Sequence, residues 1–76
     1  MSELDWIDIF AGNLRDMLID ANMSQRELAD ASGLAESTIS SYINKQKIPS
    51  LKAIINISYA LDCDVTELID FGDTIE

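Results

Sequence analysis

Residues 24–44 read SQRELADASGLAESTISSYIN, and this segment contains two short helical patterns separated by a tight turn. Ser24 and Glu27 have the Ser-x-x-Glu spacing of a capping box, in which each side chain accepts a hydrogen bond from the other residue's backbone N–H. The box predicts a helix over 25–32, and Gly33 can end it in a left-handed conformation. Only two residues separate Gly33 from the next helical pattern, 36–44. A connection this short makes the two helices cross steeply.

On either side of this segment the patterns are also helical. Upstream, residues spaced three or four apart form an apolar stripe, and Asn22 is a stop signal after it. The stripe consists of Ile7, Phe10, Ala11, Leu14, Met17, Leu18 and Ala21. Downstream, Ser50 follows the only proline as an N-cap. It precedes a fourth helix whose apolar positions 51, 54, 55, 57, 60 and 61 predict burial on nearly every side.

The chain closes with a second capping box, Asp64-x-x-Glu67, which predicts a short fifth helix from Val65 to about Asp70. We expect residues 1–4 and 71–76 to fray. The 76 residues are too few for two independent cores, and 47% hydrophobic residues are too many for a disordered chain. The sequence therefore predicts one all-α domain over 1–76, with five short helices around one core.

Composition also narrows the function. The chain has no histidine and one cysteine, which excludes the usual zinc sites, histidine-based catalytic triads and an internal disulfide. No apolar run is long enough to span a membrane, and no secretory signal is present. We therefore expect a cytoplasmic protein that is not an enzyme and needs no metal or cofactor.

The charge distribution is uneven. The chain carries 5 basic and 14 acidic residues, for a net charge of −9, which is unusual for a nucleic-acid binder. Lys45, Lys47 and Lys52 nevertheless fall within eight residues of one another with no acid between them. Such a run can contact phosphates within a repulsive surround, or it can be a solvated loop. Charge alone leaves both interpretations open.

The predicted helix 36–44 has an unusual polar face. If Ile39 is central to the buried side, with Tyr42 and Ile43 beside it, the opposite side holds Ser37, Ser40, Ser41 and Asn44. These residue types cost roughly 0.5 kcal/mol each in a helix relative to alanine, so a face made of them is locally unfavourable. Short hydroxyl and amide groups suit contact with base edges or phosphates. The alternative interpretation, a polar face that has no function, is equally consistent with the spacing of these residues.

The segments MSQRELA (23–29), ASGL (31–34), STISSY (37–42) and IPS (48–50) resemble the lambda-repressor-like helix-turn-helix family, of the Cro and xenobiotic-response-element type. The resemblance continues through Ala60-Leu61 and residues 65–69, so it covers about 10–70. It implies a recognition helix, 36–44, that enters the major groove of DNA, while helix 25–32 crosses the backbone.

The resemblance also implies which residues touch DNA. Base-edge contacts would come from Glu36, Ser37 and Ser41. Backbone contacts would come from Gln25, Thr38, Asn44, Lys45, Gln46, Lys47 and Lys52. Gln25 can instead be an ordinary surface glutamine, and Glu36 can instead stabilise the helix dipole of its own first turn.

Three positions depart from the family pattern. Ala35 stands where a serine or threonine often caps the recognition helix, which costs roughly 1 kcal/mol and leaves the helix start uncertain. Lys45 stands where glycine is common, so Asn44 is expected to take the left-handed conformation. Leu18 and Ile43 replace a buried Arg–Glu pair, and an apolar pair can do so without loss of stability.

The resemblance implies a sequence-specific, double-stranded-DNA-binding transcription regulator, most simply a repressor, that acts as a homodimer. Trp6, Phe71 and Ile75 lie outside the family core, and we expect them to cover one another or a second subunit. The alternative is an antitoxin- or antirepressor-like module that binds a protein partner and has weak or no DNA binding. The net charge of −9 favours that alternative.

Overall fold

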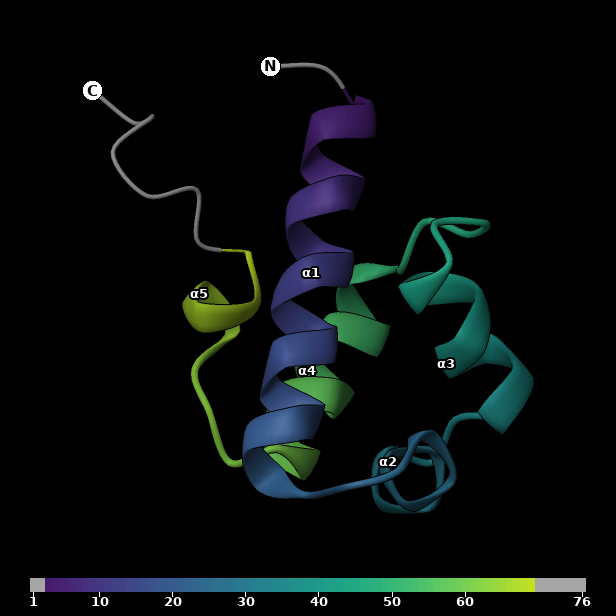
Figure 1. Ribbon diagram of the computed structural model, residues 1–76, viewed down its shortest axis with the longest axis vertical. Coiled ribbons are helices and arrows are strands. Elements are labelled where there is room, and N and C mark those ends of the chain that lie inside the picture. Colours follow the sequence, from purple (N-terminus) through teal and green to yellow (C-terminus); the bar gives the residue numbers. More distant parts are fainter. Residues whose placement is uncertain (1–2, 70–76) are drawn as a thin grey trace.

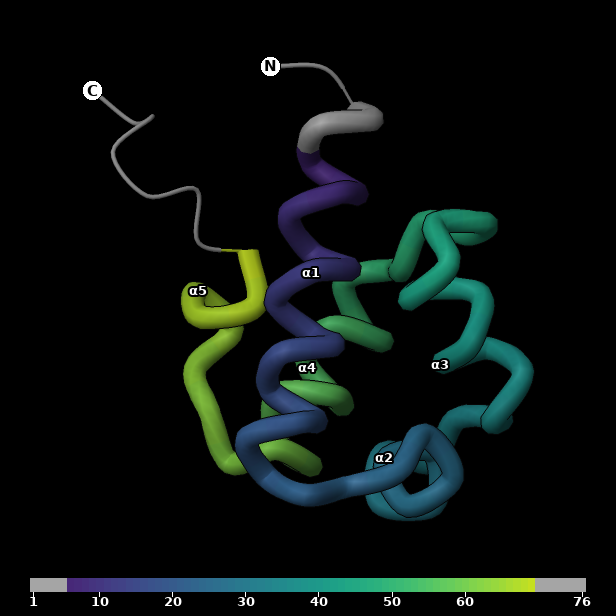
Figure 2. Tube along the Cα trace, viewed as in Figure 1, coloured from purple at the N-terminus to yellow at the C-terminus, as the bar shows by residue number. Residues whose placement is uncertain are grey.

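The structure is a computed structural model that describes the backbone of residues 3–69 and the side chains of residues 6–69. Its five helices, shown in Figure 1, are α1 (Glu3–Ala21), α2 (Gln25–Ser32), α3 (Glu36–Ile43), α4 (Leu51–Ala60) and α5 (Val65–Leu68). The predicted all-α, five-helix architecture is confirmed. The tube in Figure 2 shows α5 returning to the side of α1, where the Asn13 side-chain amide donates a 2.8 Å hydrogen bond to the Leu68 carbonyl.

The helical structure extends further toward the amino end of the chain than predicted. Helix α1 is 19 residues long, not short, and it includes Glu3 and Leu4, where fraying was predicted. Adding residues to an existing helix costs little, because the unfavourable nucleation step has already been made. Residues 1–2 and 70–76, and with them Asp70 and the frayed tail predicted over 71–76, lie outside the described residues.

The turns around α2 form as their local chemistry predicts. Glu27 N–H donates to Ser24 Oγ at 3.0 Å, and Ser24 N–H donates to Glu27 Oε1 at 2.8 Å. Asn22 ends α1 with a φ of 54°, and Gly33 ends α2 with a φ of 75°. Figure 1 shows α2 end-on while α3 runs across the view, so the two helices cross steeply.

Helix α4 is amphipathic, which contradicts the prediction that it is buried on nearly every side. Ser50 caps it by accepting a 3.1 Å hydrogen bond from Ala53 N–H. Ala53, Ile54, Ile57 and Ser58 are buried, but Leu51 and Tyr59 are 69% and 81% exposed. The buried side packs against α2 and α5, and no other part of the described chain covers the opposite side.

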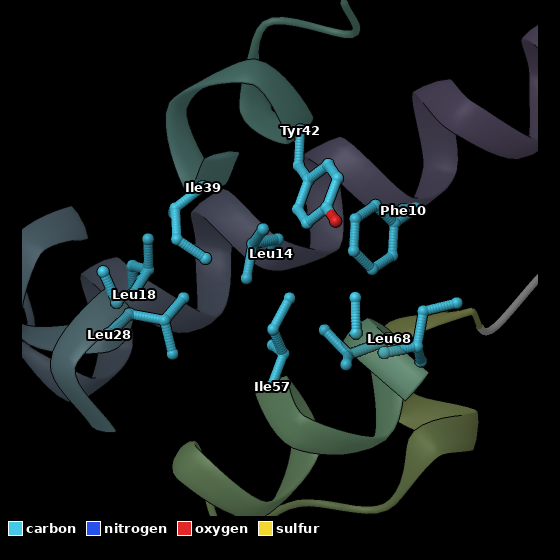
Figure 3. Close-up of a cluster of buried hydrophobic side chains, with 11 residues drawn as sticks. Phe10, Leu14, Leu18, Leu28, Ile39, Tyr42, Ile57 and Leu68 are labelled. Atoms are coloured by element: carbon cyan, nitrogen blue, oxygen red, sulfur yellow. The ribbon is translucent and has the colours of Figure 1, made fainter. Parts of the chain in front are cut away.

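The core lies between the five helices, each of which contributes buried side chains to it. Figure 3 shows its largest fully buried side chains pointing toward one another: Phe10, Leu14, Leu28, Ile39, Ile57 and Leu68. The Phe10 ring meets the Tyr42 ring edge-on at a centroid distance of 6.0 Å, and burial raises the pKa of the Tyr42 phenol. Trp6 stacks on Phe10 at 6.0 Å. Phe71 and Ile75, which were predicted to pack with Trp6, lie outside the described residues.

Candidate nucleic-acid interface

Helix α3 presents the predicted polar face to solvent. Ile39 and Tyr42 are buried, whereas on the opposite side Ser37 and Asn44 are exposed and Ser40 and Ser41 are half-buried. An α-helix with its side chains is about 10–12 Å in diameter, which fits the width of about 12 Å of the major groove of B-DNA. The exposed part of α3 therefore has the size and the polarity of a groove-binding element.

The start of α3 is set without a capping side chain. Ala35 is the N-cap and its side chain makes no cap hydrogen bond, but its carbonyl accepts from Thr38 N–H at 3.0 Å and from Ile39 N–H at 3.2 Å. The helix begins at Glu36, as predicted. Glu36 is exposed in the first turn, where its carboxylate also interacts favourably with the helix dipole.

The end of α3 differs from the prediction. Asn44 has a φ of −88°, and Lys45, with a φ of 62°, takes the left-handed conformation expected of Asn44. Lys45 N–H donates to the Tyr42 carbonyl at 3.1 Å, and Gln46 N–H donates to the Ser41 carbonyl at 2.8 Å. These two bonds form a Schellman motif, which places the left-handed residue one position beyond the C-cap. The motif, and not the residue type, decides which residue is left-handed.

The three lysines are in different environments. Lys45 Nζ lies 3.0 Å from Asp8 Oδ1, and the two side chains are 53% and 59% exposed. This pair ties the loop after α3 to the first half of α1. Lys47, in the same loop, and Lys52, in the first turn of α4, are exposed, and neither has an acidic group within ion-pair distance in the described part of the chain.

Gln25 lies at an open groove of about 680 Å³ between the end of α1, the start of α2 and the end of α3. Leu18 and Ile43 also line this groove, so the two apolar residues that replace the family's Arg–Glu pair lie together. Arg15, which is not among the residues predicted to contact DNA, lines it too. Arg15, Ile19 and Asn22 are three or four residues apart, so the sequence could have predicted that they share one face of α1. The acidic residues around Arg15 obscured that signal.

The structure places the predicted contact residues on α2, on α3, in the loop after α3 and in the first turn of α4. Glu36, Ser37 and Thr38 lie at the start of α3, whereas Ser41, Asn44 and the loop residues 45–47 lie at its other end. None of the ten predicted residues is buried. Gln25, Thr38 and Ser41 are half-buried, and the exposed ones are Glu36, Ser37, Asn44, Lys45, Gln46, Lys47 and Lys52.

The described part of the chain contains no group of three or more histidine, cysteine, aspartate or glutamate side chains that could hold a metal ion. Among the described helices, none is both long enough and apolar enough to cross a membrane.

Comparison with known proteins agrees with this geometry. A family model described as helix-turn-helix matches residues 14–68. The restriction-modification controller protein C.AhdI from Aeromonas hydrophila is 32% identical, with a TM-score of 0.79 over 82% of this chain and 94% of that chain. A hypothetical transcription factor, NHTF from Neisseria, is 28% identical, with a TM-score of 0.83 over 91% of this chain and 79% of that chain. A search of curated proteins found no match.

The match covers both short helices and the turn between them, together with the last eight residues of α1 and all of α4 and α5. It therefore includes every element that positions the exposed face of α3. The chain belongs to the lambda-repressor-like helix-turn-helix family of DNA-binding proteins.

Proposed function

We propose that the protein is a transcription regulator that binds a specific double-stranded DNA site, inserts α3 into the major groove and acts as a repressor. One observation carries the proposal: the outward face of α3 is made of short polar side chains and is followed directly by exposed lysines, on a chain whose net charge is −9. The similarity to a restriction-modification controller and to a hypothetical transcription factor supports the same role.

The residues of α3 that face away from the protein core contact the bases. The Ser37 and Ser41 hydroxyls can donate to or accept from base edges, and their small size lets the helix backbone come close to the groove floor. Glu36 can accept a hydrogen bond from the amino group of a cytosine. In this arrangement sequence preference comes from three side chains on a single turn-and-a-half of helix.

Backbone contacts fix the position of α3 in the groove. Gln25 lies in the first turn of α2, where free backbone N–H groups favour a phosphate. Lys45, Lys47 and Lys52 each neutralise a phosphate and release counterions, which makes the affinity depend on salt. Thr38, Asn44 and Gln46 add neutral hydrogen bonds to phosphate oxygens.

The acidic remainder of the chain contributes to selectivity. Every acidic residue that approaches a phosphate is repelled, so DNA is held only in the orientation that faces the lysines. Binding to random sequence is therefore weak, and specific contacts account for a large share of the affinity. A repressor of this kind acts by occupying its site and excluding other proteins from the same DNA.

The test is selection from a randomised duplex pool, followed by anisotropy titrations of the selected site at several salt concentrations. We expect one enriched motif and an affinity that falls steeply with salt. Lys47→Gln should reduce the slope of log affinity against log salt by about 0.9 without changing the motif. Lys47→Arg, which keeps the charge, should restore the slope.

The base-reading residues are tested on the same pool. Ser37→Ala and Ser41→Ala should each relax the motif at particular positions, because lost base contacts reduce discrimination while backbone contacts remain. Thr66→Ala, an exposed hydroxyl on α5, is the matched control and should change nothing. No enriched motif, and no binding even at low salt, would contradict the proposal and direct the search to a protein partner, as the antitoxin- or antirepressor-like alternative predicts.

A further inference from the structure

In the described part of the chain, Asp8 is the one acidic residue whose side chain pairs with a basic residue. Its Oδ1 lies 3.0 Å from Lys45 Nζ, and more than half of each side chain is exposed. Lys45 is also a predicted phosphate contact, in the loop that follows the recognition helix α3. Asp8 lies beyond the first turn of α1, where the helix dipole no longer stabilises a carboxylate. The pair therefore joins a candidate DNA contact to an acid that has no role in forming its own helix.

The packing of α3 on α1 fixes the place where the pair forms. Phe10, two residues after Asp8, meets the Tyr42 ring edge-on at a centroid distance of 6.0 Å, and both residues are buried (Figure 3). Lys45 N–H donates to the Tyr42 carbonyl at 3.1 Å, which holds the lysine backbone next to the same contact. The folded chain therefore keeps the Asp8 carboxylate within reach of the lysine before any DNA is bound.

A carboxylate and a phosphate offer Lys45 the same kind of partner. Both are anions that accept charge-assisted hydrogen bonds, and a lysine ammonium is a point charge on a flexible stem that can turn from one to the other. An ion pair as exposed as this one is weak, so a phosphate can displace the carboxylate. Lys47 and Lys52 have no acid within ion-pair distance among the described residues. Of the three lysines, Lys45 is therefore the one that must change partner to bind DNA.

We propose that Asp8 competes with a DNA phosphate for Lys45 and so lowers the affinity of the protein for DNA. Binding transfers the Lys45 ammonium from the carboxylate to a phosphate oxygen, and the ion pair of the free protein is lost in the complex. Lys45 in consequence adds less to the affinity than its charge alone would. This role rests on the proposed function, because it requires that α3 and the loop after it face DNA.

A double-mutant cycle measures the competition directly. The unmodified protein, Asp8→Asn, Lys45→Gln and the double variant are each titrated by anisotropy against the selected DNA site at low ionic strength. Asp8→Asn should tighten binding, and the gain should be about 1.5–5-fold larger with Lys45 present than in the Lys45→Gln background, the range expected for losing one exposed ion pair. The difference between the two backgrounds should shrink as salt rises, because salt screens exposed charges.

Asp16→Asn is the matched control. It removes the same charge from an exposed position on the same helix, and Asp16 has no basic group within ion-pair distance among the described residues. Any effect of Asp16→Asn on affinity comes from general repulsion of DNA, so it should be the same factor with and without Lys45. An equal gain from Asp8→Asn in the two backgrounds overturns the proposal, because Asp8 would then also act through general repulsion alone.

Urea unfolding of the same four proteins measures the ion pair without DNA. We expect a coupling of about 1.5–5-fold between Asp8 and Lys45 in the equilibrium constant for unfolding. A coupling in stability with none in DNA binding shows that the pair survives in the complex; it overturns the proposal and leaves the proposed function standing. An absence of DNA binding by all four proteins contradicts the proposed function, and the competition proposed for Asp8 with it.

Discussion

The backbone at Lys45 gives a stability prediction with an unusual sign. Lys45 has a φ of 62°, which costs a residue with a side chain about 1–2 kcal/mol relative to ordinary conformations. Glycine has no such cost there, but it loses more backbone entropy on folding, worth about 0.5–1 kcal/mol. We therefore expect Lys45→Gly to be more stable than Lys45→Ala, the reverse of the usual order.

The size of the difference follows from these two terms. Their balance favours glycine by about 0.5–1 kcal/mol, or roughly 2–8 °C in melting temperature for a domain of this size. The ion pair with Asp8 does not enter the comparison, because both variants lose it equally. Its own contribution is small, about 0.2–1 kcal/mol, since both side chains are more than half exposed.

The assay is thermal and urea unfolding, followed by circular dichroism, of both variants and of a control pair at Lys47. Lys47 is not among the residues with positive φ, so Lys47→Ala should be more stable than Lys47→Gly there. A Lys45→Gly variant that is no more stable than Lys45→Ala, with the control pair in its expected order, would refute the left-handed assignment and the Schellman motif with it.

Three further predictions concern the helix caps, the core and the thiol. Ser24→Ala removes a cap bond of 3.0 Å and should lower the free energy of unfolding by about 1 kcal/mol in urea titrations, whereas Thr66→Ala should leave it almost unchanged. Ile57→Ala empties a fully buried position and should cost about 2–5 kcal/mol in the same assay; a loss below that of Ser24→Ala would contradict the packing in Figure 3. Burial and nearby acidic side chains raise the pKa of the Cys63 thiol, so iodoacetamide should alkylate it more slowly, and with a higher pH midpoint, than it alkylates the urea-unfolded chain. Between the two pKa values the unfolded thiol ionises first, so this group lowers stability as pH rises; equal alkylation profiles would contradict that environment.

Much of the fold follows from short-range chemistry, which the sequence states directly. The capping box of Ser24 and Glu27, the stop at Asn22 and the cap at Gly33 each depend on residues within one turn of each other. The periodicity of the third helix likewise predicted which side of it is buried, because Ile39 and Tyr42 had to share one face. Local rules of this kind act before any tertiary contact forms, so they can be read from the chain alone.

The candidate interface was predictable in kind but not in detail. The residues of α3 were assigned to their faces correctly, but the partnership of Lys45 with Asp8 joins residues 37 positions apart that no local pattern connects. The position of Arg15 beside Gln25 could not be predicted, because the groove that both residues line forms only when α1, α2 and α3 pack together. Contacts between distant segments depend on the packing of whole helices, which a helical spacing does not encode.

What the sequence determined by itself was therefore the five helices, the caps at Ser24, Gly33 and Ser50 and the polar face of α3, since each of these rests on spacing and on hydrogen bonds within a few residues. Only the tertiary structure decided which of the other apolar side chains are buried and which are exposed to solvent. Leu51 and Ile55 are as apolar as the core residues between them, and sequence alone predicted their burial. Their exposure follows from where α2 and α5 pack against α4, because a helix buries only the side that its neighbours reach.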